Sequence, residues 1–135
     1  MGLDFGERRI GVAITDPTGT LAQPLETLTV GRGDSPLKRI AQLVAEYEVK
    51  QIVVGLPLLL DGTSGTQAQR ARRFGEDVAL LTGASVDFLD ERLTSVEAER
   101  FLREAGVPAK KQKGRVDPVA AALVLRTWLD RGSAR

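Results

Sequence analysis

Three acidic residues stand at positions that could bring carboxylates together around a metal ion. Asp4 lies inside a short apolar segment, Glu91 directly follows another, and Asp117 precedes Pro118 at the start of an Ala-rich stretch. The chain contains neither Cys nor His, which excludes thiol catalysis, Ser-His-Asp triads and zinc fingers. Chemistry must then rest on carboxylates, amines, hydroxyls and backbone groups, and oxygen ligands of this kind favour Mg²⁺ or Mn²⁺.

Each of these acids also has a purely structural explanation. Burial of an unpaired carboxylate is costly, so Asp4 is expected either to pair with a cation such as Arg9 or to bind a metal. Glu91 could be a solvated residue of a turn. Asp117 is of a type preferred at a helix N-cap, and Pro118 would suit the first turn of that helix. Taken one at a time, the acids leave both interpretations open.

Two further segments could contact a ligand. A basic cluster comes just before Asp117 and consists of Lys110, Lys111, Lys113 and Arg115. These side chains could hold phosphate groups, and the neighbouring acid favours this over the common alternative of a solvated run of charges. Residues 56–65 form an apolar, turn-rich segment in which Gly62 and Gly65 would let the backbone approach a ligand. The alternative for this segment is a hydrophobic loop that packs over a helix.

The length and composition bound the class of protein. A chain of 135 residues fits one domain, 1–135, whose core needs no disulfide or structural metal. The apolar fraction of 42% and the charged fraction of 27% are ordinary for a globular protein, and no apolar run approaches the roughly 20 residues of a membrane span. The N-terminal residues lack the pattern of a secretory signal. We therefore expect a soluble, cytoplasmic protein.

The first part of the chain has the pattern of an antiparallel meander. Short β-branched or apolar runs predict three consecutive antiparallel strands at residues 2–5, 9–15 and 20–29. Gly-containing turns separate them at 6–8 and 16–19, and Pro24 weakens the third strand.

The middle of the chain alternates helices with strands. A helix is expected from Ser35 as N-cap and Pro36 as first residue, with an apolar face of Leu37, Ile40, Ala41 and Val44. Residues 51–56 form an apolar run typical of a parallel strand, and 86–89 predict a fifth strand. The helix between these strands has an apolar stripe of Ala71, Phe74, Val78 and Leu81.

Two more helices are expected after the fifth strand. The segment from Thr94 to Glu97 matches a capping box, and helical periodicity continues to Gly106. Residues 108–115 are basic and lack apolar periodicity, which predicts a mobile loop, and 118–129 predict a final Ala-rich helix. Together the elements predict an α/β fold with a mixed five-stranded sheet and helices on both faces.

Four segments of the sequence carry a resemblance to a known family. They are GLDFGERRIGVAITD at 2–16, GLPLLLDGTSG at 55–65, DERLTS at 90–95 and KGRVDPVAAALVL at 113–125. Together, and in this order, they resemble the YqgF (RuvX) family, described as Holliday junction resolvases and as nucleases that mature the 5′ end of pre-16S ribosomal RNA. Any one segment alone would be a weak signal, but the resemblance covers nearly the whole chain.

The resemblance implies an RNase H-like fold with sheet order 3-2-1-4-5 and a nuclease active site. The family's acids fall on the three candidates already identified, Asp4, Glu91 and Asp117. These would be catalytic residues that hold one or two divalent ions, Mg²⁺ or Mn²⁺, for attack by water and release of a 3′ oxygen, which leaves 5′-phosphate and 3′-hydroxyl ends. Expected contacts to nucleic acid are Arg8, Arg9, Arg92, Thr94 and the basic cluster.

We therefore expect a metal-dependent nuclease that cuts phosphodiester bonds of structured RNA or branched DNA. Pre-16S rRNA maturation in ribosome biogenesis is favoured over junction resolution, because resolvases of this superfamily usually add a fourth acid where this chain has Ala120 and Ala121. A non-catalytic RNase H-fold module is disfavoured by the intact acids, and half of a sugar-kinase or actin-like ATPase would need a second such domain. The expected partners are nucleic acid and a pre-ribosomal particle, with no membrane, for a monomer or weak homodimer.

Overall fold

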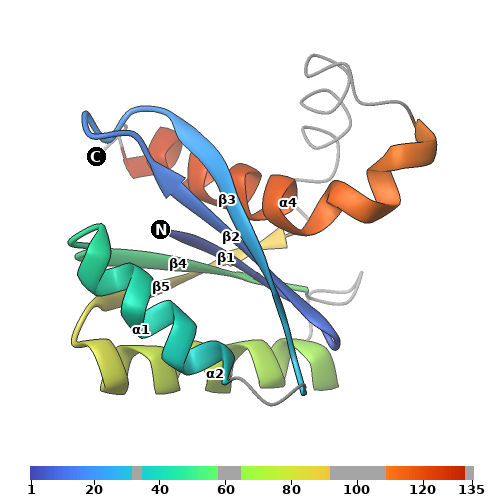
Figure 1. The fold of residues 1–135 in the computed structure, drawn as a ribbon, viewed down its shortest axis with the longest axis horizontal. Helices are drawn as coiled ribbons and strands as arrows, with labels where there is room; N and C mark the ends of the chain where they lie inside the picture. Colours follow the sequence, from blue (N-terminus) through green and yellow to red (C-terminus); the bar gives the residue numbers. More distant parts are fainter. Residues whose placement is uncertain (32–34, 58–64, 92–108, 133–135) are drawn as a thin grey trace.

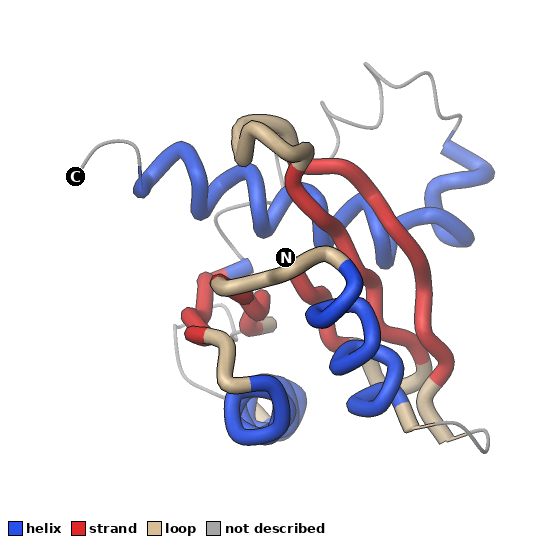
Figure 2. The backbone as a smooth tube through the Cα atoms, turned by 60° about the vertical axis from the view of Figure 1, so that its left-hand side comes forward, coloured by secondary structure: helices blue, strands red, loops and turns tan. Residues whose placement is uncertain are grey.

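The computed structural model describes residues 1–31, 35–57, 65–91 and 109–132, with side chains from 118 to 131 in the last segment. One mixed sheet has the order β3-β2-β1-β4-β5. Its strands are β1 (Gly2–Phe5), β2 (Arg9–Thr15), β3 (Ala22–Thr29), β4 (Gln51–Leu56) and β5 (Ser85–Asp90). Figure 1 shows α1 (Pro36–Glu46) and α2 (Thr66–Thr82) on one face and α4 (Ala109–Gly132) on the other, and Figure 2 shows these layers from a second direction. The expected order 3-2-1-4-5 is confirmed.

Tight turns hold the meander of β1, β2 and β3 together. Between β1 and β2 the amide of Gly6 donates to the carbonyl of Arg9 at 2.9 Å. Between β2 and β3 the amide of Gly19 donates to the carbonyl of Asp16 at 2.8 Å, and Gly19 has a φ of 72°, which residues with a side chain rarely adopt. The Asp16 carboxylate accepts the amide of Leu21, and this bond lowers the pKa of Asp16. The expected turn at 16–19 is confirmed.

Strand β3 lies at the edge of the sheet and contains a proline. The pairing with β2 passes from Glu26 directly to Pro24 at consecutive positions of β2, so Leu25 is the extra residue of a β-bulge. A proline has no amide hydrogen to donate to a ladder, so within sheets it is confined to edges and bulges. The weakness expected at Pro24 is therefore confirmed.

The alternation of side chains along the central strands decides which residues face which helices. On β1, Leu3 is fully buried toward α1 and α2, whereas Gly2 lies against α4. Because successive side chains of a strand point to opposite faces, Asp4 shares the α4 face with Gly2. On β4, Val54 packs toward α1 and α2, and Val53 packs toward α4.

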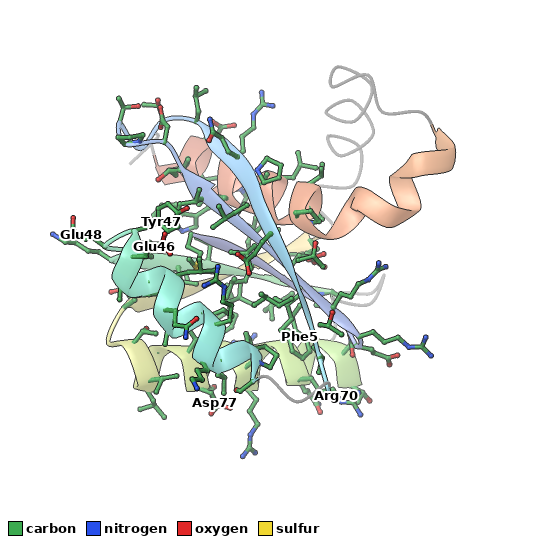
Figure 3. The ribbon with its side chains drawn as sticks, in the orientation of Figure 1. Phe5, Glu46, Tyr47, Glu48, Arg70 and Asp77 are labelled. Carbon is green, nitrogen blue, oxygen red and sulfur yellow. The ribbon has the colours of Figure 1, made fainter. Side chains whose placement is uncertain are left out.

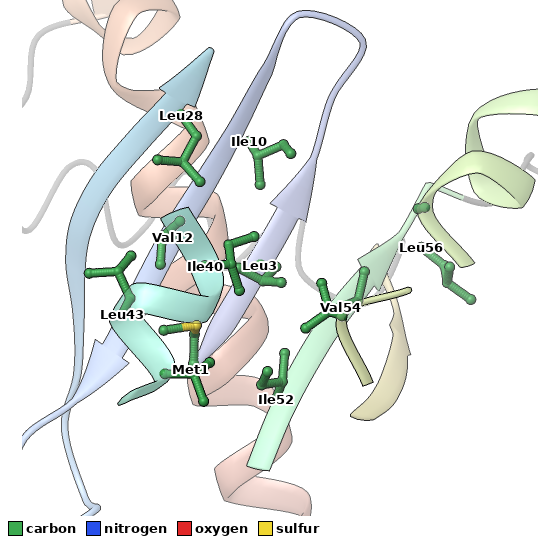
Figure 4. Packing of buried hydrophobic residues seen from close by; sticks show 13 residues of the cluster. Met1, Leu3, Ile10, Val12, Leu28, Ile40, Leu43, Ile52, Val54 and Leu56 are labelled. Atoms are coloured by element: carbon green, nitrogen blue, oxygen red, sulfur yellow. The ribbon is translucent and has the colours of Figure 1, made fainter. Parts of the chain in front are cut away.

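The larger hydrophobic cluster fills the space between the sheet and helices α1 and α2. At the end of β1 the rings of Phe5 and Phe74 lie 5.2 Å apart between centroids, and Figure 3 labels Phe5 at this end of the sheet. Figure 4 shows the centre of the cluster, whose fully buried members include Leu3, Ile10, Ile40, Ile52 and Val54. This cluster fixes the strand positions from the side opposite to Asp4.

The smaller cluster joins the sheet to α4. It combines three sheet residues with small and aliphatic residues of the helix: Ala13, Val53, Leu89, Ala121, Ala122, Val124 and Leu125. A Cβ on Gly2 would lie 2.6 Å from the carbonyl oxygen of Ala121, so only glycine lets α4 lie this close to β1.

Helices α1 and α2 follow the expected pattern with two exceptions. Ser35 and Pro36 occupy the N-cap and first position of α1, but the Ser35 side chain makes no capping hydrogen bond. The buried face of α2 consists of Ala68, Ala71, Gly75 and Val78. Leu81, expected on this stripe, is 56% exposed, because the buried face continues toward Thr82, whose hydroxyl donates to the carbonyl of Val78 at 2.7 Å.

Helix α4 corrects the expectation for the end of the chain. The sequence predicts a loop at 108–115 and a helix at 118–129, whereas α4 begins at Ala109 and contains Pro118 in its interior. Asp117 is therefore not an N-cap. Ala, Lys and Gln at the start of α4 are strong helix formers, which outweighs their lack of apolar periodicity. An internal proline removes one hydrogen bond and bends the axis, and Figure 1 shows the N-terminal part of α4 turning away from the rest.

Two expectations cannot be compared with the fold. The helix predicted from Thr94 to Gly106 and the loop glycine Gly62 lie outside the described residues. Among the helices in the described ranges, none is long and apolar enough to cross a membrane.

In a chain that begins at Met1, the N-terminal amine makes a pH-dependent contribution to stability. The ammonium of Met1 donates to the carbonyl of Gln51 at 3.0 Å, and burial lowers its pKa from 8.0 to about 6. Between these two values the folded protein binds fewer protons than the unfolded chain. Stability therefore rises with pH across this window, and the contribution is least favourable below about pH 6.

We predict that one glycine added before Met1, which places an uncharged amide at this position, removes this pH dependence. Relative to the parent, the extended chain should gain up to about 3 kcal/mol at low pH, and the gain should vanish above about pH 8.5, apart from a constant offset. Urea unfolding of both chains across this pH range checks the prediction. A difference that is the same at every pH would contradict it.

Candidate active site

Asp4 occupies an open position at the centre of the sheet. It lies on β1, the middle strand, on the face that α4 covers. Its partners across the sheet are Gly11 on β2 and Gly55 on β4, so neither neighbour presents a side chain beside it. The Asp4 carboxylate therefore has space around it that a valine or isoleucine on either strand would fill.

Glu91 is brought to Asp4 by the end of β5. Strands β4 and β5 are parallel, with Leu56 opposite Asp90, so the next residue lies beside the end of β4. A Cβ on Gly55 would lie 2.8 Å from Cγ and 2.9 Å from Cδ of Glu91, which places the Glu91 carboxyl directly over Gly55. The side chains of Asp4 and Glu91 are hydrogen-bonded to each other.

The two carboxyls repel each other when both are charged. Burial raises the pKa of Glu91 far above its ordinary value, and the hydrogen bond with Asp4 and the charges of Asp4 and Asp90 raise it further. Without a cation, this raised pKa favours a proton held between the two carboxyls. Carboxylate oxygens are the ligands that hard divalent cations prefer, and such a cation could replace this proton. The Asp4–Glu91 pair thus fits a magnesium or manganese ion.

The backbone of α4 carries Asp117 toward these two acids. Leu129, near the end of α4, lines a cavity at the edge of the sheet where β4 begins. Two turns earlier, Ala121 lies over Gly2 of β1. Asp117 comes one further turn before Ala121, about 5 Å along the helix axis toward the end of β1 that carries Asp4, at the point where Pro118 bends α4. The Asp117 side chain is outside the described part of α4.

The described side chains bring together two of the three predicted acids. Within the described residues, no group of three Asp, Glu, Cys or His side chains is close enough to hold a metal ion by itself. A third protein ligand would come from outside this set, and the direction of α4 makes Asp117 the candidate.

The predicted nucleic-acid contacts are only partly described. Arg8 and Arg9 are exposed at the turn between β1 and β2, and the alternation along β2 places Arg9 on the same face as Asp4. Arg92 and Thr94 lie outside the described residues. The basic cluster has its backbone in α4 and its side chains outside the described part: Lys110, Lys111, Lys113 and Arg115. The roles of these residues stay predictions.

Two glycines that shape the candidate site were not recognised from the sequence, Gly11 and Gly55. The glycines considered as points of close approach were Gly62 and Gly65, whereas in the described structure Gly55 makes room for Glu91. A signal was present, because a glycine inside an apolar strand such as residues 51–56 often marks a close contact. The partner in that contact could not be read from the strand alone.

The chain matches proteins of known families along almost its whole length. Residues 1–131 match the family model RuvX, described as Holliday junction resolvase. A protein of Chloroflexus aggregans named "Putative pre-16S rRNA nuclease" is 46% identical over 130 residues, covering 96% of this chain and 92% of that protein. A protein of Streptococcus sanguinis with the same name is 44% identical over 134 residues, covering 97% of this chain and 96% of that protein.

Solved structures show the same fold at low sequence identity. Thermus thermophilus RuvC in complex with a Holliday junction substrate superposes with a TM-score of 0.61 at 13% identity, covering 97% of this chain and 94% of that chain. A second Thermus thermophilus RuvC structure gives a TM-score of 0.56 at 14% identity, covering 93% of this chain and 90% of that chain. The fold is thus RNase H-like, as in RuvC. With a family match that spans residues 1–131, this chain belongs to the RuvX family.

Proposed function

We propose that this protein is a metal-dependent nuclease that hydrolyses phosphodiester bonds, with Asp4, Glu91 and Asp117 as ligands of Mg²⁺ or Mn²⁺. The observation that carries the proposal is the meeting of Asp4 and Glu91 over Gly55 on one face of the sheet. Asp4 lies near the carboxyl end of the central strand β1 and Glu91 directly follows the parallel strand β5, and ligands bind at the carboxyl ends of strands in open α/β sheets. The RuvX match and the RuvC-like fold support the same reaction class.

The residues of the site have distinct roles in this reaction. A bound divalent cation would lower the pKa of a water molecule and stabilise negative charge on the phosphate. Asp4 would hold its ligand oxygens rigidly, because β1 is hydrogen-bonded on both sides. Glu91 would turn its carboxyl toward the same point from the end of β5. Arg8 and Arg9, exposed beside the acids, would contact phosphate oxygens of the substrate.

The proposed substrate is the 5′ precursor segment of 16S rRNA, processed in the cytoplasm within a pre-ribosomal particle. The pre-16S rRNA substrate rests on the name shared by relatives about 45% identical to this chain. The 5′ segment is what the family resemblance implies, and the cytoplasm and the pre-ribosomal particle are proposed because that substrate is found there. A four-way DNA junction is the second candidate, because the family model is described as a resolvase and the RuvC neighbour was solved with a junction substrate.

A cleavage assay with matched substrates tests the reaction and its metal. The substrates are the 5′ precursor of 16S rRNA, a single-stranded RNA, a DNA duplex and a four-way junction, each with Mg²⁺, Mn²⁺ or chelator. We expect cleavage of the rRNA precursor with either metal and none with chelator, while Asp4→Asn and Glu91→Gln lose most of the activity. Undiminished cleavage in chelator would contradict the metal role. Cleavage of the junction alone would contradict the rRNA substrate and favour the four-way DNA junction.

A methyl group added at Gly55 should disturb the active site, whereas a methyl group added elsewhere in the core should affect stability alone. Gly55→Ala pushes against the Glu91 carboxyl, whereas the control Gly75→Ala pushes against the Phe88 ring on the other face, 2.7 Å from Cε1. Overpacking should lower the stability of both variants by about 1–3 kcal/mol. Only Gly55→Ala should also lose cleavage and the thermal stabilisation produced by Mn²⁺. Retention of both properties in Gly55→Ala would show that Glu91 does not need this position.

The role of Asp117 can be tested with an isosteric change. Asp117→Asn removes a negative charge near Asp4 and Glu91, so the metal-free variant should melt near or slightly above the parent. The parent should gain about 2.7 kcal/mol at a metal concentration of 100 times Kd, and the variant much less, together with a loss of most cleavage. Asp130→Asn, on the exposed last turns of the same helix, is the control. If Asp117→Asn keeps the full gain in stability on adding metal and cleaves normally, Asp117 is not a metal ligand.

A further inference from the structure

A group of arginines on α2 has no role in the site described so far. The first ten residues of the helix, 66–75, contain three arginines and no acid: Arg70, Arg72 and Arg73. All three are exposed, and Arg72 lies over the ring of Phe88 with 4.9 Å between Cζ and the ring centroid. Arg70 and Arg73 form no ion pair with the described residues. Two unneutralised cations are therefore presented by the N-terminal half of α2.

The packing of α2 places its N-terminal half near the end of β1, beside the active site. Phe74 of α2 contacts Phe5, the residue after Asp4, with ring centroids 5.2 Å apart. Arg70 comes one helical turn before Phe74 and lies on the same side of the helix. Figure 3 shows Phe5 and Arg70 at the same end of the molecule.

The turn between β1 and β2 adds a third cation to this surface. The turn follows Phe5 directly, and its Arg8 is exposed and forms no ion pair with the described residues. We call Arg8, Arg70 and Arg73 the arginine surface. It is spread over a turn and a helix and does not converge on a pocket. Such spacing suits the repeated phosphates of a nucleic-acid strand better than a single small anion.

The acids nearest to the arginine surface do not pair with it. Glu7 lies beside Arg8 in the turn, and Glu76 and Asp77 follow Arg73 by one helical turn, but none of these three acids forms an ion pair among the described residues. Glu46 and Glu48, at and just after the end of α1, lie far from Arg70 (Figure 3). The arginines are therefore available to a phosphate backbone.

We propose that the arginine surface binds the phosphodiester backbone of the substrate on the α1/α2 side of the sheet. Asp4 and Glu91 lie on the α4 side. A substrate that contacts both the acids and the arginine surface must therefore extend around the end of the sheet at which β1 ends. A folded RNA or a branched duplex has the width to do this. This inference rests on the proposed nuclease function and adds Arg70 and Arg73 as substrate-positioning residues.

The test compares two double variants that remove the same charge. Arg70→Ala/Arg73→Ala removes the α2 part of the arginine surface, and Arg126→Ala/Arg131→Ala removes two exposed arginines from the C-terminal part of α4. KM, kcat and the salt dependence of binding are measured on the structured substrate that the parent cleaves best. We expect Arg70→Ala/Arg73→Ala to lower the log-log salt slope by about 1.8 for a duplex, or about 1.4 for single strands, and to raise KM roughly tenfold or more while kcat is retained.

Two comparisons distinguish the possible failures. Arg70→Lys/Arg73→Lys keeps both charges and should keep the salt slope of the parent, which a merely structural role of these arginines would not require. If Arg70→Ala/Arg73→Ala behaves like the α4 control on a substrate that the parent cleaves, the arginine surface is a solvated face and the inference is overturned. If the parent neither binds nor cleaves any nucleic acid, the proposed function itself fails.

Discussion

Two carboxyl groups are held in hydrogen-bonding contact, one near the end of the central strand β1 and the other just after the edge strand β5. Asp4 belongs to a strand that is paired on both sides, and its neighbour Leu3 is fully buried on the opposite face. Glu91 directly follows β5, and its carboxyl lies over Gly55 on the face of the sheet that α4 covers. Burial and like charge make this arrangement unfavourable unless a proton or a cation lies between the groups. The rest of the fold supplies the rigidity that maintains it.

Glycines inside the strands provide the space that the two carboxyl groups and α4 need. A glycine inside a strand weakens the strand, because it packs no side chain and loses more entropy on folding. Here Gly2 permits the close approach of α4, and Gly55 provides the space that the Glu91 carboxyl occupies. Gly11 leaves the other side of Asp4 without a side chain. The two apolar clusters on either side of the sheet offset the stability lost through these glycines. The positions nearest to the acids therefore provide space, and the positions beyond them provide packing.

The sequence predicts what local patterns determine and fails where distant segments decide. The strands at 2–5, 9–15 and 51–56 are confirmed to the residue, because a Gly or Pro follows the end of each apolar run within two residues. Asp4 was identified from its position inside an apolar segment, Glu91 from its position after one, and both from a family resemblance. The Asp-Pro pair at 117–118 wrongly predicted a helix start, since a local capping signal cannot reveal that the preceding residues are already helical. The contact of Gly55 with Glu91 depends on the pairing of β4 with β5, which no local pattern contains.

A site built from acids must also attract a substrate that is itself an acid. Carboxylates concentrate divalent cations but repel the phosphodiester backbone, so binding of nucleic acid requires positive charge that lies near the acids without neutralising them. The fold meets both requirements through the sheet. Asp4 and Glu91 lie on the α4 face, whereas Arg70 and Arg73 project from a helix on the other face and Arg8 from the turn at the shared edge. Because the sheet separates the two sets, the arginines add to the potential at the edge while the acids remain available to the metal.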